Sequence, residues 1–208
     1  MLISLPDLMV FLSAALLLNL TPGNDMMFVL GQSLKGGPAR GIAASFGIAT
    51  GSLVHLSLVA LGVAVLLKEN PLVFETIRWA GVVYLLWIAR KMLTGPGATQ
   101  ANVDVNGSSW RAWRDGTLVN LLNPKVIVFM FAFLPPFIRP ENGMPLLQLL
   151  ILGMLFNLGG TSVNVMVAVL SGGIGRRLAT SARLARGFAY ASSAVFVALA
   201  LRLAFERK

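Results

Sequence analysis

The chain of 208 residues is 56% hydrophobic and only 12% charged, whereas soluble domains carry about 25% charged residues. This composition excludes a soluble domain and indicates an integral membrane protein. The sequence has no Cys and one His, which excludes disulfides, thiol nucleophiles and multi-histidine metal sites, and we expect neither a metal nor another cofactor. The formal net charge of +9 is assigned to basic loops between membrane spans, so we expect no nucleic-acid partner.

Proline residues divide the sequence into apolar segments of about 20 residues or more, the length needed to cross a hydrocarbon core. The segments follow one another along the whole chain, so we predict a single all-α transmembrane domain over residues 1–208. No Lys or Arg precedes Lys35, so the first segment lacks the basic start of a signal peptide and is expected to be retained. The six predicted spans are approximately residues 5–30, 41–67, 71–94, 116–137, 145–170 and 187–205.

The connections between the spans alternate in charge. Segments 31–40, 90–115 and 171–186 hold ten Lys and Arg residues, whereas the opposite side of the spans holds six. The positive-inside rule then predicts that the three basic segments are cytoplasmic and that both termini lie outside. The middle segment contains WRAWRD at residues 110–115, which we interpret as a lipid-contacting anchor in a loop at the membrane interface.

Two prolines lie within predicted spans rather than at their ends. Locally each would fit the first position of a helix, with Thr21 or Asn123 as N-cap. However, a helix from Pro124 to Phe137 would be only about 21 Å long, so the apolar residues before Asn123 must also lie in the membrane. Pro22 has the same position in the first span, within the cluster TPGND. We therefore predict that both spans are broken helices.

The sequences around the two breaks resemble each other. NLTPG begins at Asn19 and NLLNPK at Asn120, and the two prolines are 102 positions apart. Three spans per half would invert the second half, so we predict an inverted three-plus-three repeat with halves at about residues 1–104 and 105–208, the first helix of each half being broken at Pro. Matched breaks of this kind mark the binding sites of transporters, because each unpaired backbone group in lipid costs several kcal/mol.

Two ionisable side chains lie deep in the predicted spans. Asp25 is the only carboxylate well inside an apolar segment, where an Asp costs about 2.5–3.5 kcal/mol on insertion scales. It either caps the half-helix after Pro22, or binds a substrate ammonium group, transfers a proton, or both. His55 shares a helix face with Gly47 and Gly51, a close-packing pattern. It is either bonded across a helix seam or acts as a proton relay.

Other polar residues in the spans are open to more than one interpretation. Lys125 follows the second break, and it either snorkels to the interface, pairs with Asp25 or attracts a carboxylate. A polar stripe on the fifth span either makes helix–helix hydrogen bonds or lines a cavity. The candidate cavity-lining residues are Asn19, Asn120, Asn157, Thr161 and Asn164.

Over essentially its full length the chain resembles the LysE/RhtB family of bacterial amino-acid exporters. The resemblance is carried by TPGNDMMFVLGQSLKGGPARGIAASFGIATGSLVHLSLVALGVA and by NLLNPKVIVFMFAFLPPFI. Asn24 stands where the family usually has a second proline, while Pro22 and Gly23 retain the break. The resemblance implies substrate-binding or proton-coupling positions at Pro22, Gly23, Asn24, Asp25, His55, Asn123, Pro124 and Lys125.

The resemblance also implies a function, namely efflux of amino acids or close derivatives across the bacterial inner membrane by a homodimer that uses the proton motive force. The helix breaks favour a secondary exporter in which Asp25, with or without His55, exchanges a proton. The alternative is a passive channel or facilitator with a polar lumen, although nothing in the sequence resembles a selectivity filter. No recognisable catalytic spacing accompanies Asp25 and His55, so we expect no enzymatic activity.

Overall fold

The computed structural model describes residues 2–66, 79, 82–83, 86–87, 89–90, 93, 107–171 and 181–205. All secondary structure in these ranges is helical, which confirms the predicted all-α class. The predicted third span, residues 71–94, lies mostly outside the described residues. The described elements are α1 (Leu5–Leu20), α2 (Asn24–Leu66), α4 (Ser109–Leu121), α5 (Pro124–Val128), the π-helical η1 (Phe129–Phe133), the 3-10 turns η2 (Pro135–Phe137) and η3 (Pro140–Asn142), α6 (Pro145–Val169) and α8 (Ala182–Phe205).

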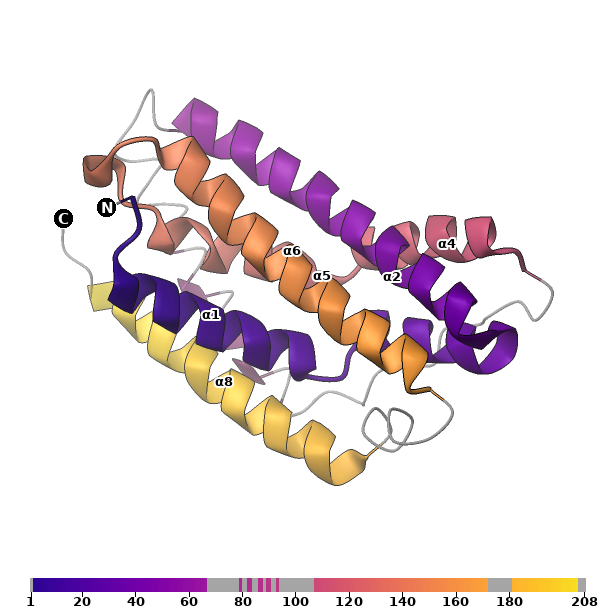
Figure 1. The fold of residues 1–208 in the computed structure, drawn as a ribbon. Coiled ribbons are helices and arrows are strands. Elements are labelled where there is room, and N and C mark those ends of the chain that lie inside the picture. Colours follow the sequence, from indigo (N-terminus) through magenta and orange to yellow (C-terminus); the bar gives the residue numbers. More distant parts are fainter. Residues whose placement is uncertain are drawn as a thin grey trace.

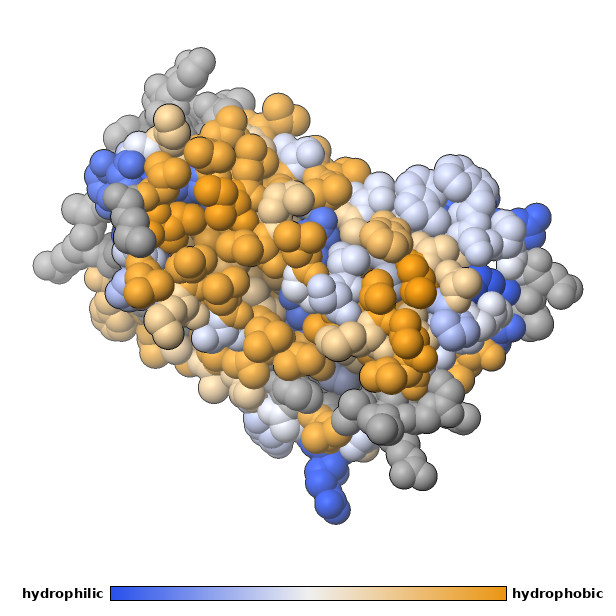
Figure 2. Space-filling model, viewed as in Figure 1, coloured by the Kyte–Doolittle hydropathy of each residue, from blue (hydrophilic) through white to orange (hydrophobic). Residues whose placement is uncertain are grey.

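The helices form one bundle. Helix α6 packs against both α1 and α2, α8 packs against α1, and α4 packs against α2 (Figure 1). Among the described residues, Asn24–Gly62 and Pro145–Val169 are long and apolar enough to cross a membrane, and the pair Ser109–Leu121 and Pro124–Phe137, bent by 57°, would make a third span. Hydrophobic residues cover much of one face of the protein (Figure 2), as expected of a surface in contact with lipid. The count of six spans remains a prediction.

The first predicted break is present. Helix α1 ends at Leu20, and its C-cap Thr21 donates its backbone N–H to the Leu17 and Leu18 carbonyls at 3.0 and 3.2 Å. The Thr21 hydroxyl also donates to the Leu17 oxygen at 2.7 Å. The next helix begins only at Asn24. Thr21 therefore closes the helix before the break, and the alternative of Thr21 as an N-cap is wrong.

The helix after this break is longer than the predicted span. It continues past residue 30 to Gly36, and α2 is then kinked at Gly37, which has φ 79° and ψ 170°. This conformation favours glycine because a Cβ would be strained there. Pro38 follows at once, with the fixed φ that suits the first turn of a helix. Gly37 alone thus separates the helix that follows the first break from the helix that contains the second predicted span.

The second predicted break is also present, but the helix before it starts earlier than expected. Helix α4 begins at Ser109, where the Ser108 hydroxyl accepts the Arg111 N–H at 3.3 Å. The WRAWRD sequence therefore forms the first turns of a helix, and its assignment to a loop was wrong. The rings of Trp110 and Trp113 stack at 4.6 Å, and Trp110 is 67% exposed. The lipid contact itself remains a prediction.

Glycines allow α4 to lie directly against α2. A Cβ on Gly47 would overlap the Trp113 carbonyl, and one on Gly51 would lie 2.9 Å from the Thr117 oxygen. From the other side, a Cβ on Gly116 would lie 2.6 Å from the Ala44 oxygen. The close packing predicted for Gly47 and Gly51 is confirmed, and its partner is α4.

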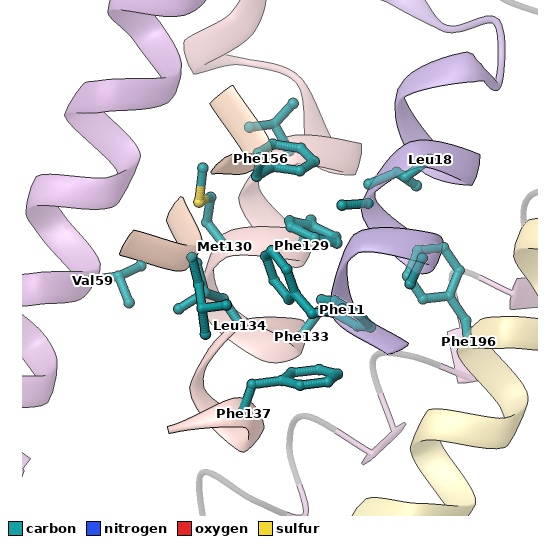
Figure 3. Packing of buried hydrophobic residues seen from close by; sticks show 14 of the residues in the cluster. Phe11, Leu18, Val59, Phe129, Met130, Phe133, Leu134, Phe137, Phe156 and Phe196 are labelled. Atoms are coloured by element: carbon teal, nitrogen blue, oxygen red, sulfur yellow. The ribbon is translucent and has the colours of Figure 1, made fainter. Parts of the chain in front are cut away.

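A cluster of aromatic rings fills the interior beside α1. Phe11, near the middle of α1, contacts three rings of the η1 and η2 segments at centroid distances of 5.4–5.7 Å (Figure 3). Phe129 stacks on Phe156 of α6 at 4.0 Å. Phe11 lies ten residues before Thr21, so about 15 Å of helix separates this cluster from the first break. The members of this aromatic cluster are Phe11, Phe129, Phe133, Phe137, Phe156 and Phe196.

Candidate functional site

The two helix breaks lie next to each other in space. The Lys125 Nζ atom, in the first turn of α5, donates to the Thr21 carbonyl oxygen at 2.8 Å, although the residues are 104 positions apart. The lysine side chain passes over Gly23, where an added Cβ would lie 3.6 Å from both Cδ and Nζ. The two breaks are therefore in direct contact and offer one candidate site rather than two.

Helix-end chemistry explains why Lys125 takes this position. The last carbonyls of a helix have no intrahelical partner, and the C-terminal end carries partial negative charge. An ammonium group near the Thr21 carbonyl donates a hydrogen bond to it and places a positive charge at the negative end of the helix. The structure therefore differs from the snorkelling interpretation of Lys125. The hydrogen bond of the Lys125 ammonium goes to the Thr21 carbonyl and not to Asp25, so the alternative of pairing with Asp25 remains a prediction.

Asp25 lies in the first turn of α2, directly after the first break. Its Oδ2 atom accepts a hydrogen bond of 2.9 Å from the Asn120 side-chain amide. Its Oδ1 atom is buried and has no hydrogen-bond partner within the described part of the chain. The helix N-terminus stabilises the negative charge, so the capping role and the presence of an acceptor oxygen for a ligand are compatible.

His55, on the part of α2 that follows the Gly37 kink, also contacts Asn120. The ring is 5% exposed, and its Nε2 atom lies 3.4 Å from the Asn120 carbonyl oxygen. Its Nδ1 atom has no partner among the described residues, and the ring meets Phe131 edge-on at 6.3 Å. Asn120 thus contacts both His55 and Asp25, one through its backbone and one through its side chain.

The second break is organised by Asn123. This residue is 3% exposed, and its Oδ1 atom caps α5 by accepting the Lys125 N–H at 3.0 Å. Pro124 occupies the first position of α5, where its missing N–H has no cost. Asn123 is therefore the N-cap of a helix that starts at Pro124, as one alternative predicts. This helix follows α4 across the second break, so the span is also broken. At the first break Pro22 and Gly23 precede the helix, and Asn24 is exposed at its start.

The remaining candidates lie on helix–helix seams. Asn157 donates to the Ala49 oxygen of α2 at 3.4 Å, and the Thr161 hydroxyl donates to Asn157 at 3.4 Å. Asn19 donates to the Phe156 oxygen at 3.3 Å and lies over glycines of α6. Asn164 is buried on α6. The bonds of Asn19 and Asn157 thus join different helices. Within the described part of the chain, no hydrogen bond links the four residues to Asp25 or Lys125.

Sequence reasoning undervalued two residues of this site. Asn120 was grouped with the cavity candidates, yet it is the residue that joins Asp25 to His55. Its position in the last turn before a break is the available signal, because side-chain amides there reach groups that a helix end leaves unpaired. Thr21 was considered only as a cap, and its carbonyl is the acceptor for Lys125. In the described residues no cluster of His, Asp or Glu is suited to a metal ion.

Comparison with known proteins finds a matching family model and several relatives. Residues 16–207 match the family model described as LysE type translocator. The homoserine/homoserine lactone efflux protein of Salmonella typhimurium is 33% identical over 78% of this chain and 76% of its own length. An uncharacterized membrane protein of Pseudomonas aeruginosa is 32% identical over 97% and 96%, and the leucine efflux protein of Klebsiella pneumoniae is 29% identical over 93% and 92%.

No solved structure matches the chain. The family match covers nearly all of the sequence and includes both helix breaks. The resemblance noted from the TPGND and NLLNPK segments is thereby confirmed. The chain belongs to the LysE family of membrane translocators.

Proposed function

We propose that the protein is a secondary transporter that exports small amino acids or their close derivatives across the inner membrane. The observation that carries this proposal is the contact between the two helix breaks, in which Lys125 donates to Thr21 at 2.8 Å beside the Asp25 carboxylate. Discontinuous helices are the usual substrate sites of secondary transporters. Two relatives are named as efflux proteins for homoserine and its lactone and for leucine.

The charges at the breaks complement an amino acid. Asp25 Oδ1 has no hydrogen-bond partner among the described residues and would accept the substrate ammonium group. The substrate carboxylate would attract the Lys125 ammonium and compete for it with the Thr21 carbonyl. Substrate binding would therefore loosen the contact between the two halves of the chain. This competition couples occupancy to a change in conformation, as an alternating-access carrier requires.

The same carboxylate would also serve proton antiport. Asp25 cannot hold a proton and an ammonium ion at the same oxygen, so the two cargoes would occupy it in alternate halves of the cycle. A proton taken up outside would be released inside, and a substrate would then bind and leave in the opposite direction. His55, whose Nε2 atom lies 3.4 Å from the Asn120 carbonyl, is a further titratable group near this carboxylate, in addition to Lys125.

The proposed architecture is an inverted repeat of residues 1–104 and 105–208 with six spans, cytoplasmic basic loops and periplasmic termini, assembled as a homodimer. Two features support the repeat. Both breaks consist of a helix end, two or three non-helical residues and a new helix. Two hydrogen bonds, Lys125 to Thr21 and Ser193 to Ala89, each join residues 104 positions apart.

Counterflow in proteoliposomes tests the function. Vesicles preloaded with unlabelled leucine, homoserine or another amino acid would be diluted into a trace of the labelled compound. A carrier gives a transient accumulation of label, because influx is exchanged for efflux. If no compound gives a peak with folded and inserted protein, while label equilibrates without saturation, the alternative of a passive channel replaces the proposal.

A further inference from the structure

The hydroxyl of Ser52 differs from the other hydroxyls of α2. Each of the other four donates to the backbone carbonyl four residues earlier at 2.9 Å, and these belong to Ser33, Ser45, Thr50 and Ser57. Such a local bond satisfies a hydroxyl within a helix. Ser52 is only 4% exposed, yet its Oγ atom has no hydrogen-bond partner in the described part of the chain. A buried hydroxyl without a partner is unfavourable, so stability alone does not explain this side chain.

Ser52 faces the interior of the bundle, between two neighbouring helices. The preceding residue, Gly51, faces α4, because a Cβ there would lie 2.9 Å from the Asn120 Oδ1 atom. Ala49 lies on the side of α6, because its carbonyl oxygen accepts a hydrogen bond of 3.4 Å from Asn157. At 3.6 residues per turn, Ser52 is about 100° round the helix from Gly51 and about 60° from Ala49. Its side chain is therefore directed between the seam with α4 and the seam with α6.

Two further buried atoms near Ser52 are unpaired. His55 follows Ser52 by three positions, a spacing that makes side chains of a helix neighbours, and its Nδ1 atom has no partner among the described residues. Its Nε2 atom lies 3.4 Å from the Asn120 carbonyl oxygen, which can only accept, so in the neutral ring Nε2 carries the proton and Nδ1 is an acceptor. The Asn120 Oδ1 atom, next to Gly51, is likewise buried and unpaired within the described ranges. We call these three atoms, Ser52 Oγ, His55 Nδ1 and Asn120 Oδ1, the polar cluster.

The polar cluster requires a ligand that donates hydrogen bonds. Two of its atoms only accept, and the third is a hydroxyl, which both donates and accepts. A ligand hydroxyl suits this set, because it donates to one of the acceptors and accepts the proton of Ser52. A carboxylate does not suit it, because a carboxylate cannot donate, and a methyl group in the same place would leave all three atoms unpaired.

The polar cluster adjoins the proposed site for the substrate ammonium group. The Asn120 side chain joins the two, since its Nδ2 atom donates to Asp25 at 2.9 Å while its Oδ1 atom belongs to the cluster. An ammonium group is attracted first to the charged Asp25 carboxylate, which leaves the cluster for another part of the same molecule. One amide group therefore separates the site for the amino group from the cluster, and a short side chain spans such a separation.

We propose that the polar cluster binds a hydroxyl group on the side chain of the substrate, with Ser52 as the residue that determines this specificity. The role rests on the proposed export of amino acids, and it names short hydroxylated amino acids as the preferred cargo. Aliphatic amino acids of the same size keep the contacts of their ammonium and carboxylate groups at the breaks. They bind more weakly, because they leave the atoms of the polar cluster unpaired.

Isosteric pairs of amino acids test this assignment. Serine and 2-aminobutyrate, threonine and valine, and homoserine and norvaline differ only by a hydroxyl in place of a methyl group, in side chains of three shapes. The Kd of each compound would be measured by calorimetric titration of the purified full-length protein in detergent, which requires no assumption about orientation in the membrane. In the wild type we expect the hydroxylated member of at least one pair to bind about tenfold more tightly than its isostere.

The variant Ser52→Ala should remove this preference. We expect the Kd of the preferred hydroxylated compound to rise about tenfold. The Kd of its isostere should stay the same or fall, because alanine leaves no unpaired hydroxyl beside an apolar side chain. Ser57→Ala is the matched control, since Ser57 is exposed on the same helix and its hydroxyl donates to the Leu53 oxygen, and it should keep the wild-type preference. Ser52 has no hydrogen bond to lose within the described residues, so Ser52→Ala should unfold at or above the wild-type temperature.

Three results would overturn the role of Ser52. The first is a wild type whose affinities are equal, or higher for the methyl compound, in all three pairs, which would indicate that ordered water satisfies the polar cluster. The second is a preference that persists in Ser52→Ala, and the third is an equal loss of affinity for both members of a pair. All three leave the export of amino acids intact, because the wild type still binds them. If the wild type binds none of the six compounds and gives no counterflow with any of them, the proposed export fails, and the role of Ser52 fails with it.

Discussion

The Lys125 Nζ atom donates a hydrogen bond of 2.8 Å to the carbonyl oxygen of Thr21, and so each helix break completes the other. The break at Thr21 leaves a helix-end carbonyl that needs a donor. The break at Asn123 supplies a helix start from which Lys125 reaches it. In an apolar surrounding each unpaired group would be unfavourable by several kcal/mol. The Thr21 carbonyl and the Lys125 ammonium group therefore avoid this unfavourable free energy only when the two breaks are in contact.

The first prediction concerns Lys125→Met, which keeps an unbranched apolar stem and removes the ammonium group. The Thr21 carbonyl loses its donor, so we expect the free energy of unfolding to fall by about 1–3 kcal/mol. Thermal unfolding in detergent measures this as a lower Tm. Lys35→Met is the matched control, because Lys35 is exposed on α2. The prediction fails if the two variants unfold at the same temperature.

The second prediction concerns Asn120→Asp. The Asn120 amide donates to Asp25 at 2.9 Å, and a carboxyl group there would face another carboxyl group at hydrogen-bond distance. The two would have to share a proton, so Asp25 would no longer offer a free negative charge to a substrate ammonium group. We expect substrate affinity to fall at least about tenfold, as measured by binding of labelled leucine to the purified protein.

Asn142→Asp is the control for this change, since Asn142 is exposed in η3, far along the chain from both breaks. It introduces the same charge and should leave binding unaltered. Wild-type affinity in Asn120→Asp, with the protein folded, would contradict the arrangement of Asp25 and Asn120 described above.

The third prediction concerns the role of Asp25 in proton coupling, as distinct from its role in substrate binding. Asp25→Asn keeps the size of the side chain and removes the group that titrates. We expect it to abolish accumulation driven by an imposed pH gradient in proteoliposomes, while the protein remains folded and inserted. Glu141→Gln, an exposed change in η3, should retain accumulation at the wild-type level. Gradient-driven transport that persists in Asp25→Asn would eliminate its role in coupling.

The sequence alone predicted those features that depend on local backbone chemistry. A helix does not continue undisturbed through Pro22 or Pro124, because proline lacks the backbone N–H that a helix interior needs. Gly47 with Gly51 forms a surface that a second helix can approach. These features follow from single residues and their spacing. Both breaks and the close helix seam are accordingly present where they were predicted.

The partners of the site residues could not be predicted in the same way. Whether Lys125 meets Thr21, Asp25 or the membrane surface depends on how α4 and α5 are placed against α1 and α2. The register of α4 on α2 depends on close backbone contacts at Gly47, Gly51 and Gly116, where a Cβ atom would overlap the other helix. The periodicity of one helix does not reveal which residues of the other helix lie at these contacts. The same register brings Asn120 between His55 and Asp25.

The fourth prediction tests that register directly. In Gly47→Ala the added Cβ would overlap the Trp113 carbonyl, and backbone cannot move aside as a flexible side chain does. We expect α4 to be displaced and the Tm to fall, corresponding to about 1–3 kcal/mol of overpacking. Gly62→Ala is the matched control in the same helix, because no described atom beyond the local helix backbone lies within 4 Å of a Cβ there.

The two glycine variants have opposite expected signs. Alanine is a better helix former than glycine by up to about 1 kcal/mol, so Gly62→Ala should leave the Tm unchanged or raise it. Because α4 carries Asn120, Gly47→Ala should also weaken substrate binding, whereas Gly62→Ala should not. A Gly47→Ala protein with the stability and affinity of Gly62→Ala would show that contact between α2 and α4 at Gly47 does not position the site.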